Sequence, residues 1–276
     1  MTFEYAEMTK RNIGFVTEGQ QDILRRSRVF VCGAGGMGGA CLQTLVRSGV
    51  GAFEVADFDR FEVSNLNRQV FATMDTVGQP KALIAALRLN EINPEVQVRV
   101  HEAGWVLDLE NILRRSHVVV NAMDDILASI RLYRMAAAMG VTVIDAYAST
   151  LPSVYVTKPE NPRPEERLAF PTVGIALEAI TKEMVEESRL LEIAYVFEHS
   201  SSSCHGDQSV LDDVIAGRRP RISFAPMVIL TGNLMAYEAI FALCGISPSA
   251  GGAGYFFNPY IARIEQPGPA RCERNS

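Results

Sequence analysis

The sequence predicts an α/β protein with a Rossmann-like, doubly wound, mostly parallel sheet and a C-terminal extension of antiparallel strands. A short apolar run at 29–32 stops at a glycine cluster. A helical pattern follows and ends at Gly49, and a second apolar run fills 53–56. Strand, glycine turn, helix and strand in this order make a βαβ unit. Three consecutive valines at 118–120 then predict a parallel strand that is buried on both faces.

The first half of the chain continues this alternation. Residues 17–20 have the form of a capping box, which predicts a helix that ends near Arg26. The polar stretch 58–80 has little periodicity, and a loop of that length inside a compact domain is usually functional or disordered. The other elements expected here are a helix at 81–91, a strand at 96–100, a strand at 117–121, a helix at 126–139 and a strand at 141–144 that ends at Asp145.

The pattern changes after residue 150. We expect an exposed connection at 158–171, a helix at 178–193, a polar and mobile segment at 199–207, an apolar helix at 226–243 in the core or at a subunit interface, and a closing hairpin of 255–257 and 261–264. The chain then divides into an N-terminal helical arm (1–28), a Rossmann-like nucleotide-binding domain (29–150), and a crossover and substrate-binding region (151–276) whose helix and strands pack on the same domain.

The bulk composition is that of a soluble globular protein. Hydrophobic residues make up 48% of the 276 residues, and the formal net charge of -6 argues against a nucleic-acid or membrane-surface binder. The sequence contains no run of about 18 apolar residues that would predict a membrane span, and the polar start of the chain does not fit a signal peptide. Five cysteines without a CxxC pair favour a reducing compartment, so we expect a cytoplasmic protein.

The glycine turn predicts a nucleotide site. Gly33, Gly35 and Gly38 match G-x-G-x-x-G between a strand and a helix, with Gly36 inside the turn. Such glycines permit a tight turn, close approach of the backbone to phosphate, and close packing of helix on strand. Asp57 ends the second strand, where a carboxylate meets ribose hydroxyls. This pattern alone fits NAD, FAD, S-adenosylmethionine and ATP equally well.

The loop after the second strand favours a triphosphate. Arg68 lies in this loop and Lys81 begins the next helix, and cations at these positions suit the charge of a departing pyrophosphate. Asp124 follows the strand at 117–121 and is well placed to hold Mg²⁺ beside a phosphate site. The adjacent Asp125 leaves a second interpretation open, in which this acidic pair only caps the following helix.

The motifs that carry these residues resemble the ThiF/MoeB/HesA adenylating enzymes, which are related to the E1 enzymes that activate ubiquitin-like proteins. The resemblance runs from Lys10 to Asp145 and returns faintly at 225–243. It rests on GAGGMG at 33–38, DFDRFEVSNLNRQVF at 57–71, VGQPK at 77–81, INP at 92–94 and NAMDD at 121–125. We expect such specific motifs to occur together only in a member of this family.

The resemblance implies an enzyme that uses MgATP to adenylate a carboxylate, usually the C-terminal glycine of a ubiquitin-like or sulfur-carrier protein, and releases pyrophosphate. It implies that Asp57 holds the ribose, that Asp124 is linked to magnesium, and that the phosphates are bound by Asn65, Arg68 and Lys81. Asp59 and Gln69 belong to the same motif and are further nucleotide-binding candidates. Arg11 matches an arginine that reaches the neighbouring subunit's ATP site, which implies a homodimer.

The chain departs from the family at its cysteines. Many members hold a structural zinc with two CxxC pairs, and no such pair occurs here, so we expect no zinc. Cys204, beside His205, is a candidate nucleophile for acyl transfer, although its position does not match the family's usual cysteine. The alternative is a free loop cysteine. His101, His117 and His199 have no metal-ligand spacing, and we interpret them as structural.

Two other functions stay open at this point. A NAD(P)-dependent oxidoreductase would explain the glycine turn but not the cations, and a non-catalytic E1-like partner subunit would keep the fold without the reaction. The acyl substrate also stays open between a ubiquitin-fold protein, a peptide and a small acid. The sequence does not decide whether a thioester forms on Cys204, or whether sulfur, an amine or another group accepts the acyl-adenylate.

Overall fold

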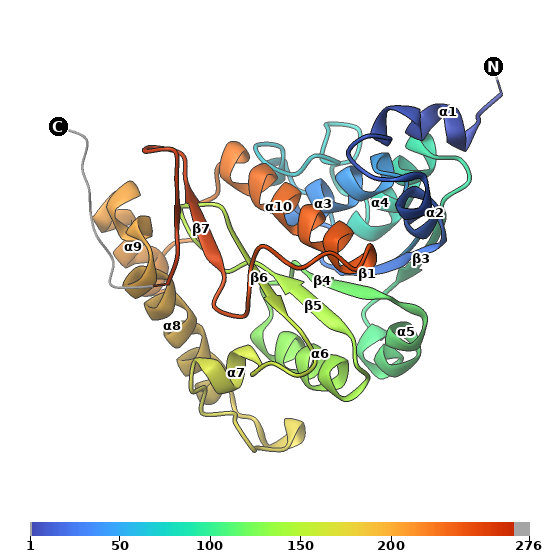
Figure 1. The fold of residues 1–276 in the computed structure, drawn as a ribbon. Helices are drawn as coiled ribbons and strands as arrows, with labels where there is room; N and C mark the ends of the chain where they lie inside the picture. Colours follow the sequence, from blue (N-terminus) through green and yellow to red (C-terminus); the bar gives the residue numbers. More distant parts are fainter. Residues whose placement is uncertain (1, 268–276) are drawn as a thin grey trace.

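A computed structural model describes residues 2–267, which form one continuous sheet covered by helices (Figure 1). The strand order is β3-β2-β1-β4-β5-β6-β7-β8. The first five strands are parallel, and the last three pairings, from β5 to β8, are antiparallel. The strands are β1 Arg28–Cys32, β2 Ala52–Ala56, β3 Gln97–His101, β4 Val118–Asn121, β5 Thr142–Asp145, β6 Ser153–Thr157, β7 Tyr255–Asn258 and β8 Arg263–Glu265. The predicted fold class is confirmed.

Helices cover both faces of the sheet. One face carries α1 Tyr5–Thr9, α2 Glu18–Arg26, α3 Gly36–Arg47, α4 Lys81–Ile92 and α10 Ala225–Leu243, and the other carries α5 Leu109–Arg115 and α6 Ile126–Ala138 (Figure 1). Beyond α6 lie α7 Pro164–Arg167, α8 Lys182–His199 and α9 Gln208–Ile215. Short 3-10 turns occupy η1 Lys10–Asn12, η2 Val63–Asn65, η3 Trp105–Leu107, η4 Leu177–Ala179 and η5 Ser201–His205.

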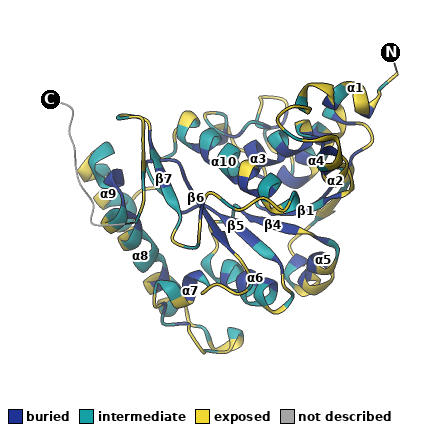
Figure 2. Cartoon of the chain, viewed as in Figure 1, coloured by how far each residue is buried: buried dark blue, intermediate teal, exposed yellow. Residues whose placement is uncertain are grey.

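The core follows from the alternation of side chains along β1. Val29 and Val31 pack against α3, α4 and α10, while Phe30 and Cys32 pack against α5 and α6. Successive side chains of a strand point to opposite faces, so a strand covered on both sides must be apolar throughout. Figure 2 shows the same result, with buried residues concentrated in the central strands and on the sides of the helices that face them.

The apolar helix predicted at 226–243 is α10. Among the described helices it alone is long and apolar enough, by length and composition, to span a membrane. It packs on α3, and a Cβ placed on Gly232 would overlap Met37 O and lie 2.7 Å from Ala40 Cβ. The glycine therefore lets two helices meet closely, and the apolar composition of α10 is explained by its place over the sheet.

The predicted capping box, closing hairpin and mobile segment all lie within the described residues. The capping box is confirmed, since Thr17 Oγ1 accepts a hydrogen bond from Gln20 N at 3.1 Å, and the closing hairpin is confirmed as β7 and β8. The expectation of a mobile segment at 199–207 is wrong, because η5 lies there and both Ser201 and Ser202 are buried and hydrogen-bonded.

The connection at 158–171 is also more ordered than its composition predicts. It contains α7, whose Glu165 is buried and ion-paired with Arg134 of α6 at 2.7 Å. The strand β6 was not predicted at all. It is buried along its whole length between β5 and β7, and its valines, tyrosine and threonine are residue types that favour strands, so this signal was available in the sequence.

Candidate nucleotide-binding site

The site lies where the order of the parallel strands reverses, between β1 and β4. In open α/β sheets ligands bind at the carboxyl ends of the strands at such a point. The last residues of four parallel strands, Ala56, Cys32, Asn121 and Asp145, are neighbours in register and form a row along this edge. Each predicted site motif begins just beyond this row: the glycine turn after β1, the loop after β2 and the acidic pair after β4.

The glycine turn has the geometry that its residues predict. Gly33 has φ +89°, and a Cβ on it would lie 2.6 Å from Ala122 O. A Cβ on Gly38 would overlap Gly33 O, and one on Gly36 would overlap the Val228 side chain of α10. Gly35 is the N-cap of α3, whose first backbone N–H groups therefore receive no side-chain cap. Free amides at a helix start attract anions.

Asp57 joins the glycine turn to the loop after β2. Its Oδ2 accepts a hydrogen bond from Ala34 N at 2.7 Å and its Oδ1 accepts one from Asp59 N at 2.9 Å. Burial raises the pKa of Asp57, and the two backbone hydrogen bonds oppose that rise. The carboxylate thus stands beside the turn, at the place where a ribose would be held.

Lys81 is buried, with an exposed fraction of 7%, so it is not a solvated surface cation. Its Nζ forms an ion pair with Asp59 Oδ2 at 2.9 Å, and the carboxylate of Asp59 is largely exposed. Arg68 is half-buried and donates from Nη1 to Ser64 O and to Asn67 Oδ1, both at 2.8 Å. Within residues 2–267, Arg68 has no ion pair.

Asn65 and Gln69 are both buried beside these cations. Asn65 Oδ1 accepts a hydrogen bond from Glu62 N at 3.1 Å and so shapes the loop. Gln69 Oε1 is buried without a hydrogen-bond partner, and a Cβ on Gly35 would lie 3.6 Å from Gln69 Nε2. The amide of Gln69 therefore stands against the glycine turn with an unused acceptor.

The two acids after β4 have different roles. Asp125 Oδ1 accepts a hydrogen bond from Ala128 N at 3.0 Å and caps α6. Asp124 is exposed and is not this cap, so the capping interpretation belongs to Asp125. No group of three or more His, Cys, Asp or Glu side chains suited to a metal ion occurs in the described part of the chain.

A buried network behind the row of strand ends was not predicted. Asn121 Nδ2 donates to Asp145 Oδ2 at 2.9 Å, and Tyr133 OH donates to the same oxygen at 2.8 Å. Burial raises the pKa of Asp145 to about 6, although these hydrogen bonds oppose the rise. The sequence signal that was available is the position of Asn121 and Asp145 at the ends of adjacent strands.

Arg11 and Cys204 do not join this site within one chain. The arm that carries Arg11 is anchored at the C-terminal end of α3, where Tyr5 OH donates to Gly49 O at 2.7 Å, and the glycine turn is at the other end of that helix. Arg11 itself is exposed. Cys204 lies in η5 and is disulfide-bonded, so the expectation of a free loop cysteine is wrong, and a thioester there would require this bond to open first.

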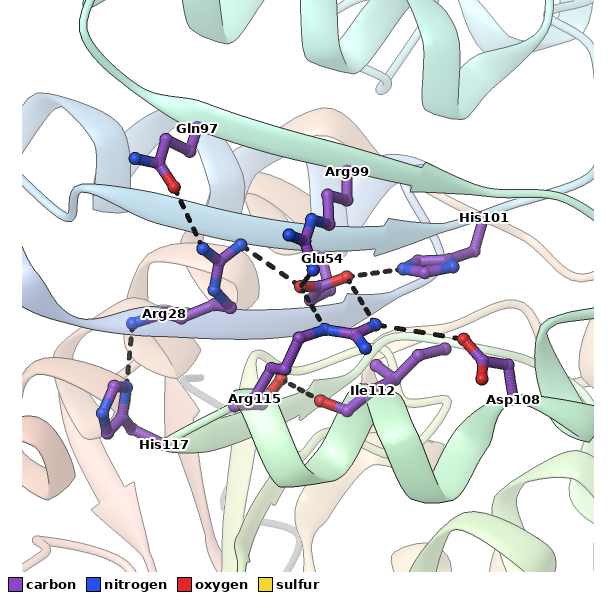
Figure 3. A network of polar contacts seen from close by, with 10 residues as sticks. Arg28, Glu54, Gln97, Arg99, His101, Asp108, Ile112, Arg115 and His117 are labelled. Carbon is purple, nitrogen blue, oxygen red and sulfur yellow. Dashed lines mark hydrogen bonds and ion pairs between the residues drawn. The ribbon is translucent and has the colours of Figure 1, made fainter.

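A second charged cluster, drawn in Figure 3, surrounds Glu54 in the middle of β2. Glu54 is fully buried and receives hydrogen bonds from Arg28 at 3.2 Å and Arg115 at 3.2 Å, with His101 Nε2 at 2.7 Å. Burial would raise the pKa of Glu54, but its hydrogen bonds to Arg115 and His101 outweigh burial and lower it. His117 Nδ1 accepts from Arg28 N at 3.0 Å, so His101 and His117 are structural residues, as expected.

Known proteins resemble this chain in sequence and fold. A sulfur carrier protein adenylyltransferase of Thermus thermophilus is 48% identical over 108 residues, which are 38% of this chain and 39% of that protein. The chain thus spans about two fifths of the length of that relative. A crystal structure of E. coli tRNA N6-threonylcarbamoyladenosine dehydratase with ATP is 25% identical, with a TM-score of 0.50 over 52% of this chain and 61% of the other.

A third protein resembles this chain in fold over nearly its whole length. E. coli MccB, in a structure with MccA, has a TM-score of 0.67 and covers 99% of this chain and 73% of its own, at 18% identity. At this identity the likeness concerns the fold alone. The model of the ThiF family matches residues 9–266, from the N-terminal arm to β8. This chain therefore belongs to the ThiF family.

Proposed function

We propose that this chain is an ATP-dependent adenylyltransferase that converts a carboxylate into an acyl-adenylate and releases pyrophosphate. The observation that carries the proposal is one edge of the sheet, where a glycine turn and a buried Lys81 lie with Gln69 and Arg68. Among residues 2–267, the Gln69 acceptor has no donor and Arg68 has no ion pair. The name of the Thermus thermophilus relative supports the same reaction on a sulfur carrier protein. We therefore propose a C-terminal glycine of a ubiquitin-like or sulfur-carrier protein as substrate.

The residues fit ATP as the nucleotide. Gln69 Oε1 is a buried acceptor that lacks a donor, and an amino or hydroxyl group of the nucleoside would supply one. Asp57 would accept from the ribose, and the uncapped start of α3 would receive phosphate oxygens. A nicotinamide cofactor would have no use for both Arg68 and Lys81, so a NAD(P)-dependent oxidoreductase is not favoured.

The mechanism follows from charge. The attacking carboxylate is already ionised at neutral pH and needs no general base. Negative charge grows on the α-phosphate and on the departing pyrophosphate, where Arg68, Lys81 and the amides of the α3 start would stabilise it. Asp124 would hold Mg²⁺ together with the phosphates, and the ion would neutralise phosphate charge. Since Asp59 is exposed, it can release Lys81 to the nucleotide without leaving a buried charge unpaired.

Exchange of ³²P between pyrophosphate and ATP tests the reaction. Purified protein with a copurified small protein ending in Gly-Gly should catalyse exchange, and the same small protein with an amidated C-terminus should not. Arg68→Ala and Lys81→Ala should each lower kcat by at least about a hundredfold with a smaller change in ATP affinity. Arg88→Ala is the control, because Arg88 lies on α4 and pairs with Glu91 at the surface. Near wild-type exchange by Arg68→Ala would contradict the assignment.

We also propose that the active form is a homodimer in which Arg11 enters the partner's site. The arm carries exposed apolar side chains beside Arg11, with Phe15 96% and Ile13 44% exposed, which fits burial against a second copy. Mixing Arg11→Ala with Lys81→Ala protein tests this, because only a mixed dimer that shares Arg11 between subunits has one complete site. Restored exchange is expected. No exchange in mixed dimers would place Arg11 outside the partner's site.

We also propose a soluble location. It is supported by the packing of α10 over the sheet, which accounts for the apolar composition of this helix. The disulfide at Cys204 is typical of an oxidising compartment and does not support the cytoplasmic expectation. Fractionation of cells that express the full chain tests it, since the protein should stay in the supernatant at high and low salt. Recovery with the membrane fraction would contradict it.

A further inference from the structure

The unpaired buried polar atoms of this molecule gather in two places. Among residues 2–267 they are Gln69 Oε1, Ser153 Oγ, Tyr155 OH, Arg167 Nε and Arg167 Nη1. Gln69 belongs to the nucleotide site. The other three residues lie together around β6, where Ser153 and Tyr155 share one face of the strand. A buried donor or acceptor left unpaired costs about 1–3 kcal/mol, and more when charged, so such atoms indicate where a ligand binds.

Arg167 stands inside a box of three tyrosines, which we call the Arg167 box (Arg167, Tyr147, Tyr155 and Tyr195). Its Cζ lies 4.9 Å from the ring centroid of Tyr195, 5.8 Å from that of Tyr147 and 5.9 Å from that of Tyr155. Arg167 Nη2 donates to Tyr147 OH at 2.6 Å. Contacts with ring faces stabilise the positive charge but leave the N–H groups of Nε and Nη1 without acceptors.

Arg167 also lacks a counter-ion in the described part of the chain. Arg134, Arg163 and Arg189 on the neighbouring helices all have carboxylate partners. The acids near Arg167 do not fill this role. Asp145 already accepts from Asn121, Tyr133 and Ala146. Glu192 forms no ion pair with Arg167 among the described residues, and burial raises its pKa to about 8. A guanidinium without a counter-ion fits a carboxylate from outside the chain.

The Arg167 box lies on the same edge of the sheet as the nucleotide site. Tyr155 pairs with Asp145 in register, Asp145 with Asn121, and Asn121 with Cys32, which precedes the glycine turn. Three strand spacings separate β1 from β6, or about 14 Å. An extended peptide covers that distance in about four residues. A carboxylate at Arg167 is therefore distinct from one that reacts at the nucleotide.

The crossover after α9 lies against the nucleotide loop, where Asn67 Nδ2 donates to Ser223 O at 3.0 Å. A substrate chain that runs from β6 toward the glycine turn would approach this contact.

A glycine-rich segment covers the box. A Cβ on Gly252 would lie 3.9 Å from Arg167 Nε, so this segment lies against the guanidinium. Tyr195 OH donates to Ala253 O at 2.7 Å and holds the segment from the exposed side. Gly254 has φ +71°, and a Cβ on it would overlap the Tyr155 ring. Displacement of residues 251–254 would open the way to Arg167.

We propose that the Arg167 box binds an acidic side chain of the acyl substrate, located about four residues before the carboxyl group that is adenylated. The carboxylate accepts hydrogen bonds from Arg167 Nε and Nη1, and the tyrosine rings pack on the residue that carries it. This inference rests on the proposed function, because it takes the reacting carboxyl group to lie at the nucleotide site. It makes Arg167 a specificity-determining residue.

Direct peptide binding tests the proposal without the reaction. The probes are fluorescein-labelled heptapeptides ending in Gly-Gly, with a single Glu at each position before the pair and with Gln in its place as reference. With the full chain and a non-hydrolysable ATP analogue, fluorescence anisotropy should give about tenfold tighter binding for Glu than for Gln near the fourth position from the end. Arg167→Gln should abolish this preference, and Arg163→Gln, which alters a neighbouring arginine paired with Glu166, should keep it.

Several outcomes would overturn the inference. They are equal affinity for Glu and Gln peptides, a preference that persists in Arg167→Gln, and no measurable binding of any probe. A Glu preference that is lost on amidation of the C-terminus would place the terminal carboxylate at Arg167 instead and would equally contradict the side-chain assignment. Tyr155→Phe, which removes one unpaired hydroxyl, checks the result with a variant that keeps the charge. Failure of the proposed function is separate, since it would leave the binding preference intact but give no pyrophosphate exchange.

Discussion

Two buried charges on opposite halves of the sheet contrast in how completely they are paired. Glu54, in the middle of β2, is surrounded by Arg28, Arg115 and His101, and Arg99 Nη1 lies 3.8 Å away (Figure 3). Arg167, on α7, has tyrosine rings around it, and two of its nitrogens have no acceptor among the described residues. Neighbouring elements surround both charges, yet only Glu54 has its hydrogen-bond and ion-pair partners without a ligand.

A structural charge differs from a ligand-binding charge in where its partners come from. Removing a charge from water is unfavourable, and the protein offsets this by supplying partners. Around Glu54 all partners come from the chain, from β1, β3 and α5, so the cluster joins these elements. Around Arg167 the chain supplies a hydroxyl and aromatic faces but no carboxylate within the described residues. We infer that the missing partner comes with the substrate.

The largest effect is expected from breaking the complete network. Glu54→Gln keeps the shape of the side chain but leaves the arginines around it without their carboxylate. The free energy of unfolding should fall by about 3 kcal/mol, measured by urea denaturation. Glu110→Gln is the control, because Glu110 pairs with Arg114 at the surface, where such a pair contributes about 0–1 kcal/mol. If the free energy of unfolding of Glu54→Gln fell by less than about 1 kcal/mol, Glu54 would behave like a surface ion pair and would not differ from Arg167 in stability.

A smaller loss of stability is expected from substitutions in residues 251–254, the segment that covers the Arg167 box. Gly254→Ala places a Cβ into the Tyr155 ring and a non-glycine residue at φ +71°, so the free energy of unfolding should fall by about 2 kcal/mol. Gly252→Ala meets only ordinary contact at 3.9 Å and should change it by less than about 0.5 kcal/mol. Thermal unfolding of both variants measures the difference. Equal stability would mean that the box is not held rigidly by this segment.

Arg167→Gln should affect stability least among the charge changes, in spite of the burial of its nitrogens. The substitution removes a cation that has no counter-ion in the described chain, so the free energy of unfolding should stay within about 1 kcal/mol of wild type. Urea denaturation beside Glu54→Gln gives the comparison directly. A loss as large as that of Glu54→Gln would show that Arg167 is a structural charge.

The two regions should also respond to pH with opposite sign. The pKa of Glu54 is lowered in the folded chain, so its contribution is present above its unfolded pKa and is lost as the pH falls. The pKa of Glu192 is raised to about 8, so its contribution is present below its unfolded pKa and is lost as the pH rises toward 8. Unfolding temperatures from about pH 2 to 9 should show that Glu54→Gln flattens the acid limb and Glu192→Gln the neutral-to-alkaline limb. The reverse pattern would contradict both assignments.

The first half of the fold was predictable because its strands are covered on both faces. Such strands must be apolar throughout, so β1 and β4 stand out as short apolar runs bounded by glycine or polar residues. The residues of the candidate nucleotide site were proposed from the sequence because backbone approach to phosphate requires glycine, and charge neutralisation requires cations near the turn. Their individual roles in binding remain predictions, although the burial of Lys81 and the capping role of Asp125 narrow them.

The second half was less predictable because the burial and bonding of its side chains depend on residues that are distant in the sequence. Arg167 lies in a proline- and charge-rich stretch that composition alone marks as exposed. The ion pair of Arg134 with Glu165 fixes α7 against α6, and this places Arg167 over the rings of Tyr147 and Tyr155. Likewise, the serines near Cys204 resemble a mobile loop until they are seen to bond with Thr150 and Glu265.

The doubly wound fold and the glycine turn follow from the sequence alone, which also proposes the polar residues of the candidate nucleotide site. These depend on local rules, because side-chain periodicity, turn conformation and phosphate contacts are set by residues close together in the chain. The burial of Lys81 against Asp59 is visible only in the folded chain. The same holds for the polar atoms of Gln69 and Arg167 that have no partner among residues 2–267, and for the complete pairing of Glu54. Pairing of a buried charge is a property of the elements that surround it, and those elements meet only in the folded chain.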